Sequence, residues 1–281
     1  MATIAELENI ASQVRRDIVR MVNACSSGHP GGSLGCADLM SALYFDALDC
    51  NPENFTIEGR GEDMFFLSNG HISPVWYSVL ARKGFFTVSD LATFRKIGSP
   101  LQGHPTPKYN LPGVRIASGS LGQGLSVGIG AALAKKLNGC NHLVYTLHGD
   151  GELQEGQIWE AVMFAAGNKV DNLISIIDVN NAQIDGKVED VLPIGNLKDK
   201  FIAFGWEALE MQGNDMKDCV EVLKKAKSLT KKGKPVVILM HTLMGYGVDF
   251  MQGSYKWHGV APNNEQTANA LSQLKETLGD Y

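Results

Sequence analysis

The segment with the clearest chemical potential is His148-Gly-Asp-Gly-Glu-Leu-Gln-Glu-Gly156, where Asp150 stands between two glycines. Asn180 follows thirty residues later, an interval that fits one helix and one strand. Gly-Asp-Gly alone is compatible with an ordinary turn, but this spacing to Asn180 favours a functional site. Both segments follow apolar runs that predict strands, and in an open α/β sheet the carboxyl ends of adjacent strands border the ligand crevice. The Asp150 carboxylate, the Asn180 amide oxygen and the Ala182 carbonyl are hard ligands suited to Mg²⁺ or Ca²⁺. Such a cation would also need oxygens from water and a phosphate group.

Four further segments combine glycine with histidine or serine. They are Ser27-Gly-His-Pro-Gly31, Ser68-Asn-Gly-His71, Gln102-Gly-His-Pro105 and Gly119-Ser-Leu-Gly-Gln-Gly124. Glycine-rich turns let backbone N–H groups approach an anion, and imidazoles can shuttle protons or hydrogen-bond hydroxyls near neutral pH. A lone histidine is more often structural, but five of the seven histidines lie in glycine-rich or junction segments, which favours a binding site.

The elements that must position these residues alternate between strand and helix. Apolar runs predict strands at 65–68, 142–147, 173–179, 206–211 and 235–243, and helical spacing predicts helices at 4–24, 37–48, 74–80, 125–137, 152–166 and 265–278, with a lysine-rich helix before the last strand. This alternation predicts an α/β fold with an open, mainly parallel sheet and helices on both faces. No segment has the composition of a linker, so we expect a single domain over residues 1–281.

Composition excludes several classes of protein. The 281 residues are 44% hydrophobic and 20% charged, and no apolar run approaches the roughly 20 residues of a membrane span. The net charge of −5 offers no basic surface for nucleic acid. Because the first residues carry an acidic pair in place of a signal peptide's basic region, we expect a cytoplasmic protein. The five scattered cysteines suggest neither a disulfide framework nor a zinc site.

At this point the sequence resembles the thiamine-diphosphate enzymes, in which Gly-Asp-Gly followed about thirty residues later by asparagine marks the metal-diphosphate site. Within that group it is similar to the transketolase family over nearly the whole chain. The four glycine-containing segments occur in the family's order, and Trp257-His-Gly259 completes the set. The resemblance implies a diphosphate-binding domain of the thiamine-diphosphate fold.

The resemblance also assigns roles. It implies thiamine diphosphate and Mg²⁺, for which Ca²⁺ or Mn²⁺ can substitute, as cofactors. The metal would be held by Asp150, Asn180 and the Ala182 carbonyl, the cofactor would be lined by His71, Gly119, Ser120, Leu121, Asp150, Gly151 and Asn180, and His29, His104 and His258 would act in catalysis. Glu155 and Glu160 resemble residues of the subunit contact, although each is also compatible with an exposed helix charge. Met244 stands where some relatives carry lysine, so cationic assistance from that position is missing.

The resemblance covers the family's diphosphate-binding domain, and we expect its pyrimidine-binding and carboxyl-terminal domains to be absent from this chain. We therefore expect a partner subunit that carries them, in an assembly with two copies of each chain. The expected reaction is transfer of a two-carbon ketol unit from a ketose phosphate to an aldose phosphate.

Three other interpretations remain open. One is another thiamine-diphosphate reaction, either 1-deoxyxylulose-5-phosphate synthesis or decarboxylation of a 2-oxo acid, and another is a cofactor-binding module without catalysis. A dinucleotide-binding Rossmann domain is disfavoured, because residues 119–124 lack the GxGxxG spacing.

Overall fold

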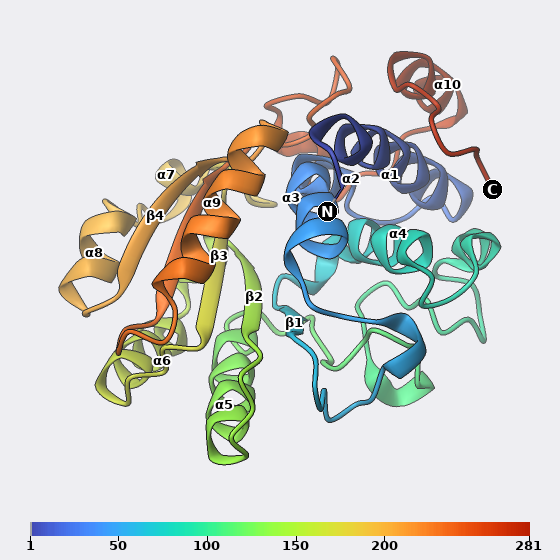
Figure 1. Cartoon of the computed structure of the whole chain (residues 1–281). Helices are drawn as coiled ribbons and strands as arrows, with labels where there is room; N and C mark the ends of the chain where they lie inside the picture. Colours follow the sequence, from blue (N-terminus) through green and yellow to red (C-terminus); the bar gives the residue numbers. More distant parts are fainter. Residues whose placement is uncertain (1) are drawn as a thin grey trace.

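Parallel strands form the centre of the protein in a computed structural model that describes residues 2–281 (Figure 1). The strands are β1 (Met64–Leu67), β2 (Val144–Gly149), β3 (Leu173–Val179), β4 (Glu207–Gln212) and β5 (Val236–His241). Their order across the sheet is β1-β2-β3-β5-β4, and every neighbouring pair is parallel. The central strand β3 is rich in isoleucine and almost wholly buried, which is typical of a strand covered on both faces. The prediction of an open parallel α/β sheet is confirmed.

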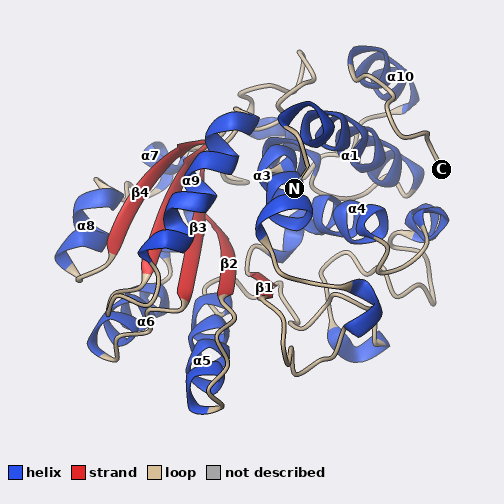
Figure 2. Ribbon diagram, in the orientation of Figure 1, coloured by secondary structure: helices blue, strands red, loops and turns tan. Residues whose placement is uncertain are grey.

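Helices cover both faces of the sheet (Figure 2). One layer contains α5 (Gly124–Leu137), α6 (Gly156–Gly167) and α8 (Leu197–Ala203), and the other contains α9 (Met216–Leu229), α3 (Ala37–Ala42), α1 (Ile4–Ala24) and α4 (Ser73–Lys83). Right-handed crossovers explain why α5, α6 and α8 share one face while α9 lies on the other, because a helix changes face when the chain reverses its direction across the sheet. The chain turns back between β4 and β5, so α9 lies in front of the strands in Figure 1.

Several predicted boundaries were wrong, each for a local reason. The glycine-rich segment after His29 forms the short helix α2 (Pro30–Gly35), with proline in its first turn. The predicted helix 37–48 splits into α3 and a π-turn. The helix expected from residue 152 begins at α6, after a 3-10 turn. The final helix α10 (Asn264–Gln273) stops early because the Gln13 side chain accepts the N–H groups of Thr277 and Leu278. The short helices α7 (Val188–Val191) and α8 were not predicted.

Two further features bear on the classes considered above. Within residues 2–281, no helix combines the length and the apolar character needed to cross a bilayer. All five cysteines are free thiols, with Cys36 and Cys219 buried.

Asp280 is one of the residues that hold the carboxyl-terminal segment against α1. Asp280 accepts hydrogen bonds from Arg16 Nε at 2.9 Å, Arg16 Nη2 at 2.7 Å and Gln13 Nε2 at 2.9 Å. These hydrogen bonds, those from Arg16 first, lower the pKa of Asp280 to about 2. Because the folded pKa is depressed, the stabilisation is present above the ordinary aspartate pKa near 3.9 and is lost as the pH falls towards 2.

Asp280→Asn is expected to lower the free energy of unfolding by about 1–2 kcal/mol at pH 7, because charge-assisted hydrogen bonds are lost. Urea unfolding at a series of pH values measures this, and the difference from wild type should narrow below pH 4. Glu276→Gln is the matched control, since Glu276 is more exposed and lies 3.6 Å from Arg16. Equal effects of the two substitutions would contradict the assignment to Asp280.

Candidate active site

A cleft of about 440 Å³ opens at the carboxyl-terminal edge of the sheet. It is lined by the segments that follow β1, β2, β3 and β5, by the loop before α2, and by residues near 104, 119 and 258. Every site residue expected from the sequence lines this cleft except Ser120, which is exposed and lies beside it in the chain; the lining residues are His29, His71, His104, Gly119, Leu121, Asp150, Gly151, Asn180, Ala182 and His258. Segments more than two hundred residues apart therefore meet in one cavity.

The floor of the cleft carries two buried carboxylates. Asp150 Oδ1 accepts the N–H of Gly151 at 2.8 Å, and its Oδ2 accepts the N–H of Asn181 at 2.6 Å. Asp178 accepts hydrogen bonds from the Asn180 amide at 2.8 Å and from the Thr242 hydroxyl. The Asn180 side chain is thereby oriented, and its oxygen accepts the Ala182 N–H at 2.9 Å. The ends of β2 and β3 thus bring the acidic and amide groups together.

The charges on this floor have no cationic partner among the described residues. Burial, followed by the charge of Asp178, raises the pKa of Asp150 to about 7, and burial raises the pKa of Asp178 to about 6. Within residues 2–281, no group of three His, Cys, Asp or Glu side chains is arranged to hold a metal. A cation here would therefore take amide, carbonyl and phosphate oxygens beside one carboxylate, and the donors present fit a hard divalent ion.

Four histidines form a cluster opposite the acidic floor. The ring centroid of His29 lies 5.1 Å from that of His71, 5.6 Å from that of His258 and 6.1 Å from that of His104. The rings of His71 and His258 are 5.0 Å apart. Since these residues come from four separate loops, their sequence positions alone give no sign of these distances.

Burial keeps the four imidazoles neutral. It lowers the pKa of His29 to about 4, with smaller contributions from His258, Arg95 and His104. It also lowers the pKa values of His71, His104 and His258. Nδ1 of His29 and Nδ1 of His258 are buried and have no hydrogen-bond partner within residues 2–281. Neutral imidazoles with free nitrogens suit hydrogen bonding to a polar ligand and proton transfer near pH 7.

A residue that the sequence analysis did not assign holds the glycine-rich loops in place. Glu152 is almost fully buried, and one carboxylate oxygen accepts hydrogen bonds from the Ser68 hydroxyl and from the Gly122 N–H at 2.8 Å. Its other oxygen accepts the Gly149 N–H at 3.2 Å. Although burial raises the pKa of Glu152, His148 and these donors outweigh burial and lower it. Glu152 therefore ties the ends of β1 and β2 to the loop before α5.

Glu152→Gln is expected to destabilise the chain by about 2–3 kcal/mol, because an amide cannot accept all three hydrogen bonds and buries an unmatched N–H₂ group. Cofactor affinity should fall as well, since the Gly119–Gly124 loop loses its anchor. Thermal unfolding and equilibrium titration of thiamine diphosphate measure the two effects. Glu221→Gln, on the exposed side of α9, is the control and should leave both unchanged. A variant that unfolds like wild type would exclude the anchoring role.

Close backbone approach also requires glycine in this region. A Cβ at Gly70 would lie 2.5 Å from the Ser118 carbonyl oxygen, so only glycine lets the segment after β1 meet the loop before α5. Gly122 adopts a φ of +85°, a conformation that other residues rarely adopt. The two segments can therefore border one cavity.

Other residues line the cleft although the sequence did not assign them to the site. They are Gly32, Asn69, Ile72, Gly149, Glu152, Gln154, Glu155, Asp178, Gln183, Ile184 and Met244. Asn69 stands inside a recognised motif and Asp178 lies near the end of the predicted strand 173–179, so their positions at strand ends could have indicated them. Glu155 lies at the cleft, whereas Glu160 lies on the outer face of α5 and α6. Asn69 Oδ1 is buried without a partner in the described chain and is free to bind a ligand.

The chain is similar to known proteins over almost its whole length. The family model "Transketolase, thiamine diphosphate binding domain" matches residues 7–279. The chain is 38% identical to an apulose-4-phosphate transketolase subunit of Phocaeicola vulgatus over 98% of this chain and 96% of that protein. It is 36% identical to 6-deoxy-6-sulfo-D-fructose transketolase subunit SqwG of Clostridium sp., over 96% of this chain and 97% of that protein.

Solved structures agree with the family match. The crystal structure of transketolase from Campylobacter jejuni superposes with a TM-score of 0.89 at 36% identity, covering 97% of this chain and 43% of that chain. The fold and cleft thus define a thiamine-diphosphate-binding domain. The chain belongs to the transketolase family, as a subunit that corresponds to its thiamine-diphosphate-binding part. Thiamine-diphosphate-dependent ketol transfer is the reaction class of this family member, and the chain is a transferase subunit.

Proposed function

We propose that this chain, with a complementary subunit, transfers a two-carbon ketol unit from a ketose phosphate to an aldose phosphate in the cytoplasm, as in the pentose phosphate pathway. One observation carries the proposal: four neutral histidines face the buried Asp150 and the half-buried Asn180 across one cleft. A domain that only bound the cofactor would need the acidic floor and His71, but it would have no use for the other three histidines.

The cofactor would be held along the floor of the cleft. Backbone N–H groups at the Gly119-Ser120-Leu121 turn and at Gly151 would face the diphosphate, since glycine-rich turns accommodate anions. His71 would line the same face. When bound, thiamine diphosphate supplies the electron sink for cleavage and formation of a carbon–carbon bond.

A divalent cation would join the cofactor to this floor. The Asp150 carboxylate, the Asn180 side-chain oxygen and the Ala182 carbonyl would bind Mg²⁺, with Ca²⁺ or Mn²⁺ as substitutes, and phosphate and water oxygens would complete its shell. The raised pKa of Asp150 supports this proposal, because its charge is buried beside Asp178 with no counter-ion from residues 2–281. A backbone ligand at residue 182 tolerates alanine as well as a larger side chain.

The histidines would act on the sugar. His29, His104 and His258 would hydrogen-bond substrate hydroxyls and accept or return a proton at the reacting hydroxyl group, which neutral imidazoles can do near pH 7. Met244 closes the same cleft with an apolar side chain and provides no cation. We expect the partner subunit to contribute most of the residues that grip a substrate phosphate.

The outer face of α5 and α6 suits the partner. Val127, Met163 and Phe164 expose 41%, 60% and 49% of their surface, which is unusual for large apolar side chains of neighbouring helices. The occupant we propose is the complementary transketolase subunit with the pyrimidine-binding domain, because chains similar to this one are named as single subunits of transketolases. Two copies of each chain would form the enzyme, with Glu155 and Glu160 at the contact.

Phe164→Glu is expected to weaken binding of the complementary subunit by roughly tenfold or more, since a buried charge opposes apolar contact. Analytical ultracentrifugation of the mixed subunits measures the affinity. Leu278→Glu is the matched control, because Leu278 is 50% exposed and lies in the carboxyl-terminal segment beside α1, away from α5 and α6. If both variants bind equally well, the partner surface lies elsewhere.

Reconstitution tests the function. The purified chain, the complementary subunit, thiamine diphosphate and Mg²⁺ are combined with a ketose phosphate and an aldose phosphate, with 6-deoxy-6-sulfo-D-fructose as a second donor and with pyruvate in place of the ketose. An aldose elongated by two carbons when a ketose is the donor supports ketol transfer. Product that forms only when pyruvate replaces the ketose favours the synthase or decarboxylase alternative. Cofactor binding without turnover in any mixture favours the non-catalytic module.

A further inference from the structure

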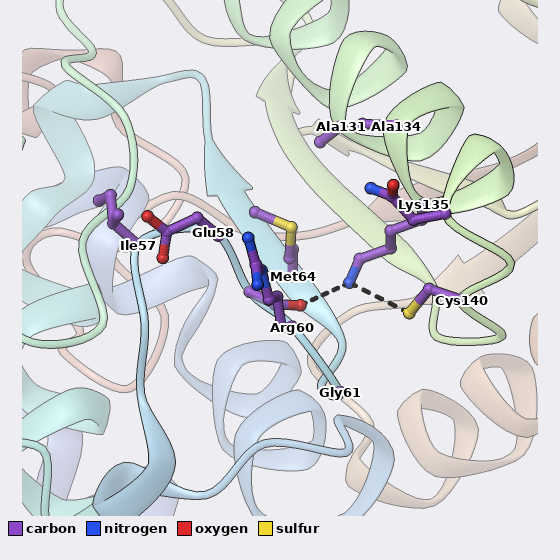
Figure 3. Close-up of a pocket in the computed structure, with 11 residues that line it drawn as sticks. Ile57, Glu58, Arg60, Gly61, Met64, Ala131, Ala134, Lys135 and Cys140 are labelled. Atoms are coloured by element: carbon purple, nitrogen blue, oxygen red, sulfur yellow. Dashed lines mark hydrogen bonds between the residues drawn. The ribbon is translucent and has the colours of Figure 1, made fainter.

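A second cleft lies at the edge of the sheet opposite the candidate active site. Its volume is about 510 Å³, and it lies between the 57–61 loop, the start of β1 and the last turns of α5 (Figure 3). Cys140 and Lys135 line it, and Figure 3 shows the lysine side chain reaching towards the sulfur atom. Because β2 separates the two edges and rises about 3.3 Å per residue, roughly 20 Å divide this cleft from Asp150.

Cys140 belongs to a connected set of polar groups. Its Sγ lies 3.4 Å from Nδ1 of His142, and Nε2 of that histidine lies 3.2 Å from Oδ2 of Asp49. Lys135 Nζ lies 3.9 Å from the sulfur and is fixed by the carbonyl oxygens of Gly59 and Glu62, each at 2.8 Å. The order cysteine, histidine, carboxylate is the arrangement that activates a nucleophilic thiol.

The two contacts of His142 fit the tautomer in which Nε2 carries the proton. With a neutral imidazole, Nε2–H donates to Asp49 and Nδ1 accepts the Cys140 S–H. When the proton moves to Nδ1, both ring nitrogens donate, one to the thiolate and one to the carboxylate. The Lys135 ammonium adds a second positive charge beside the sulfur. Charged groups around the cleft also include Glu58, Arg60, Glu62 and Asp63.

Three of the other cysteines lie in environments that disfavour the thiolate. Burial raises the pKa values of Cys36 and Cys219, and it raises that of Cys50 to about 11. Burial also acts on Cys140, but hydrogen bonds with His142 and the charge of Lys135 outweigh it, so the net pKa is lowered. Cys140 is half-buried, which leaves its sulfur open to small molecules.

We propose that Cys140 is a site of reversible thiol modification that forms a mixed disulfide with a low-molecular-weight disulfide. The thiolate attacks one sulfur of the small disulfide, so that a new S–S bond forms as the old one breaks. The departing thiolate takes the proton held by His142 and leaves as a thiol. Cys140 is oxidised and the small disulfide is reduced, with no further reactant required. The adjacent cleft accommodates the attached group.

The test uses the full-length chain and oxidised glutathione as the probe. Samples are quenched at intervals between pH 6 and 9, and peptide mass spectrometry gives the rate at each cysteine. Cys140 is expected to react fastest, and Cys140→Ser should remove the fast phase. His142→Gln should move the midpoint of the pH–rate profile upward and lower the rate at pH 6.5 by roughly threefold or more. Asp49→Asn should have a smaller effect in the same direction.

Controls separate activation from exposure. In urea the cysteines should all react at similar rates, and circular dichroism verifies that the His142 variant is folded. Faster reaction of Cys25 or Cys50 in the folded chain would overturn the proposal, as would an unchanged pH profile in His142→Gln. Because no partner or cofactor is needed, failure here is distinguishable from failure of the ketol-transfer proposal.

Discussion

Asp150→Asn is expected to reduce metal-dependent ketol transfer by at least roughly 100-fold at limiting Mg²⁺. The substitution removes the one carboxylate that we propose as a metal ligand, and loss of even an outer-shell partner costs 10–100-fold in metal affinity. Isothermal titration of thiamine diphosphate, with Mg²⁺ and with a chelator, measures the coupling between metal and cofactor. Wild type should bind the cofactor much more tightly with metal, whereas the variant should show little difference.

The fold should survive this substitution. The folded pKa of Asp150 is raised to about 7, so ionisation of the buried group opposes folding as the pH rises from about 4 through 7. The substitution removes a buried charge, which stabilises the fold, and loses one hydrogen bond that the amide nitrogen cannot accept, which destabilises it. Because the two effects offset each other, the metal-free variant should unfold within a few degrees of wild type at pH 8. Asp190→Asn removes the same charge from exposed α7 and is the control. Undiminished turnover of Asp150→Asn at limiting Mg²⁺ would refute the metal assignment.

His29→Ala and His258→Ala are each expected to lower turnover by about 100-fold or more while changing cofactor affinity less than about threefold. Both side chains have a buried Nδ1 with no partner in the described chain, and general acid–base groups typically contribute 10²–10⁴-fold. Steady-state kinetics with the assembled enzyme gives turnover, and titration of thiamine diphosphate gives affinity. His241→Gln, on an exposed residue at the end of β5, is the control. Equal loss of cofactor affinity would reassign both residues to cofactor binding.

The same cluster has a pH signature in stability. The folded pKa of His29 is lowered to about 4, so its contribution is present above the ordinary histidine pKa near 6.5 and is lost as the pH falls towards 4. The free energy of unfolding of wild type, measured with urea, should therefore fall as the pH falls across that interval. The free energy of unfolding of His29→Ala should fall less over the same range. Parallel curves of this free energy against pH for the two proteins would contradict burial of a neutral imidazole.

Most of the candidate site was visible in the sequence because its residues stand in short motifs at the ends of strands. Asp150 and Asn180 follow β2 and β3 directly, and periodicity placed those strands within two residues. The sequence did not predict the 3-10 turn after Asp150. In this turn the Glu152 carboxylate accepts the N–H of Gly122, which lies thirty residues earlier in the chain. Local patterns carry no information about such partners.

The sequence by itself determined the alternation of strands and helices and the residue types of the cleft, since each depends on neighbours within a few positions. The order of the motifs along the chain determined the family. Tertiary structure decided the rest. It alone placed His29 5.6 Å from His258, buried Asp150 beside Asp178, and set Cys140 against His142 and Lys135. The physical reason is that burial and distance set protonation and reactivity, and both arise from packing between segments that lie far apart in the chain.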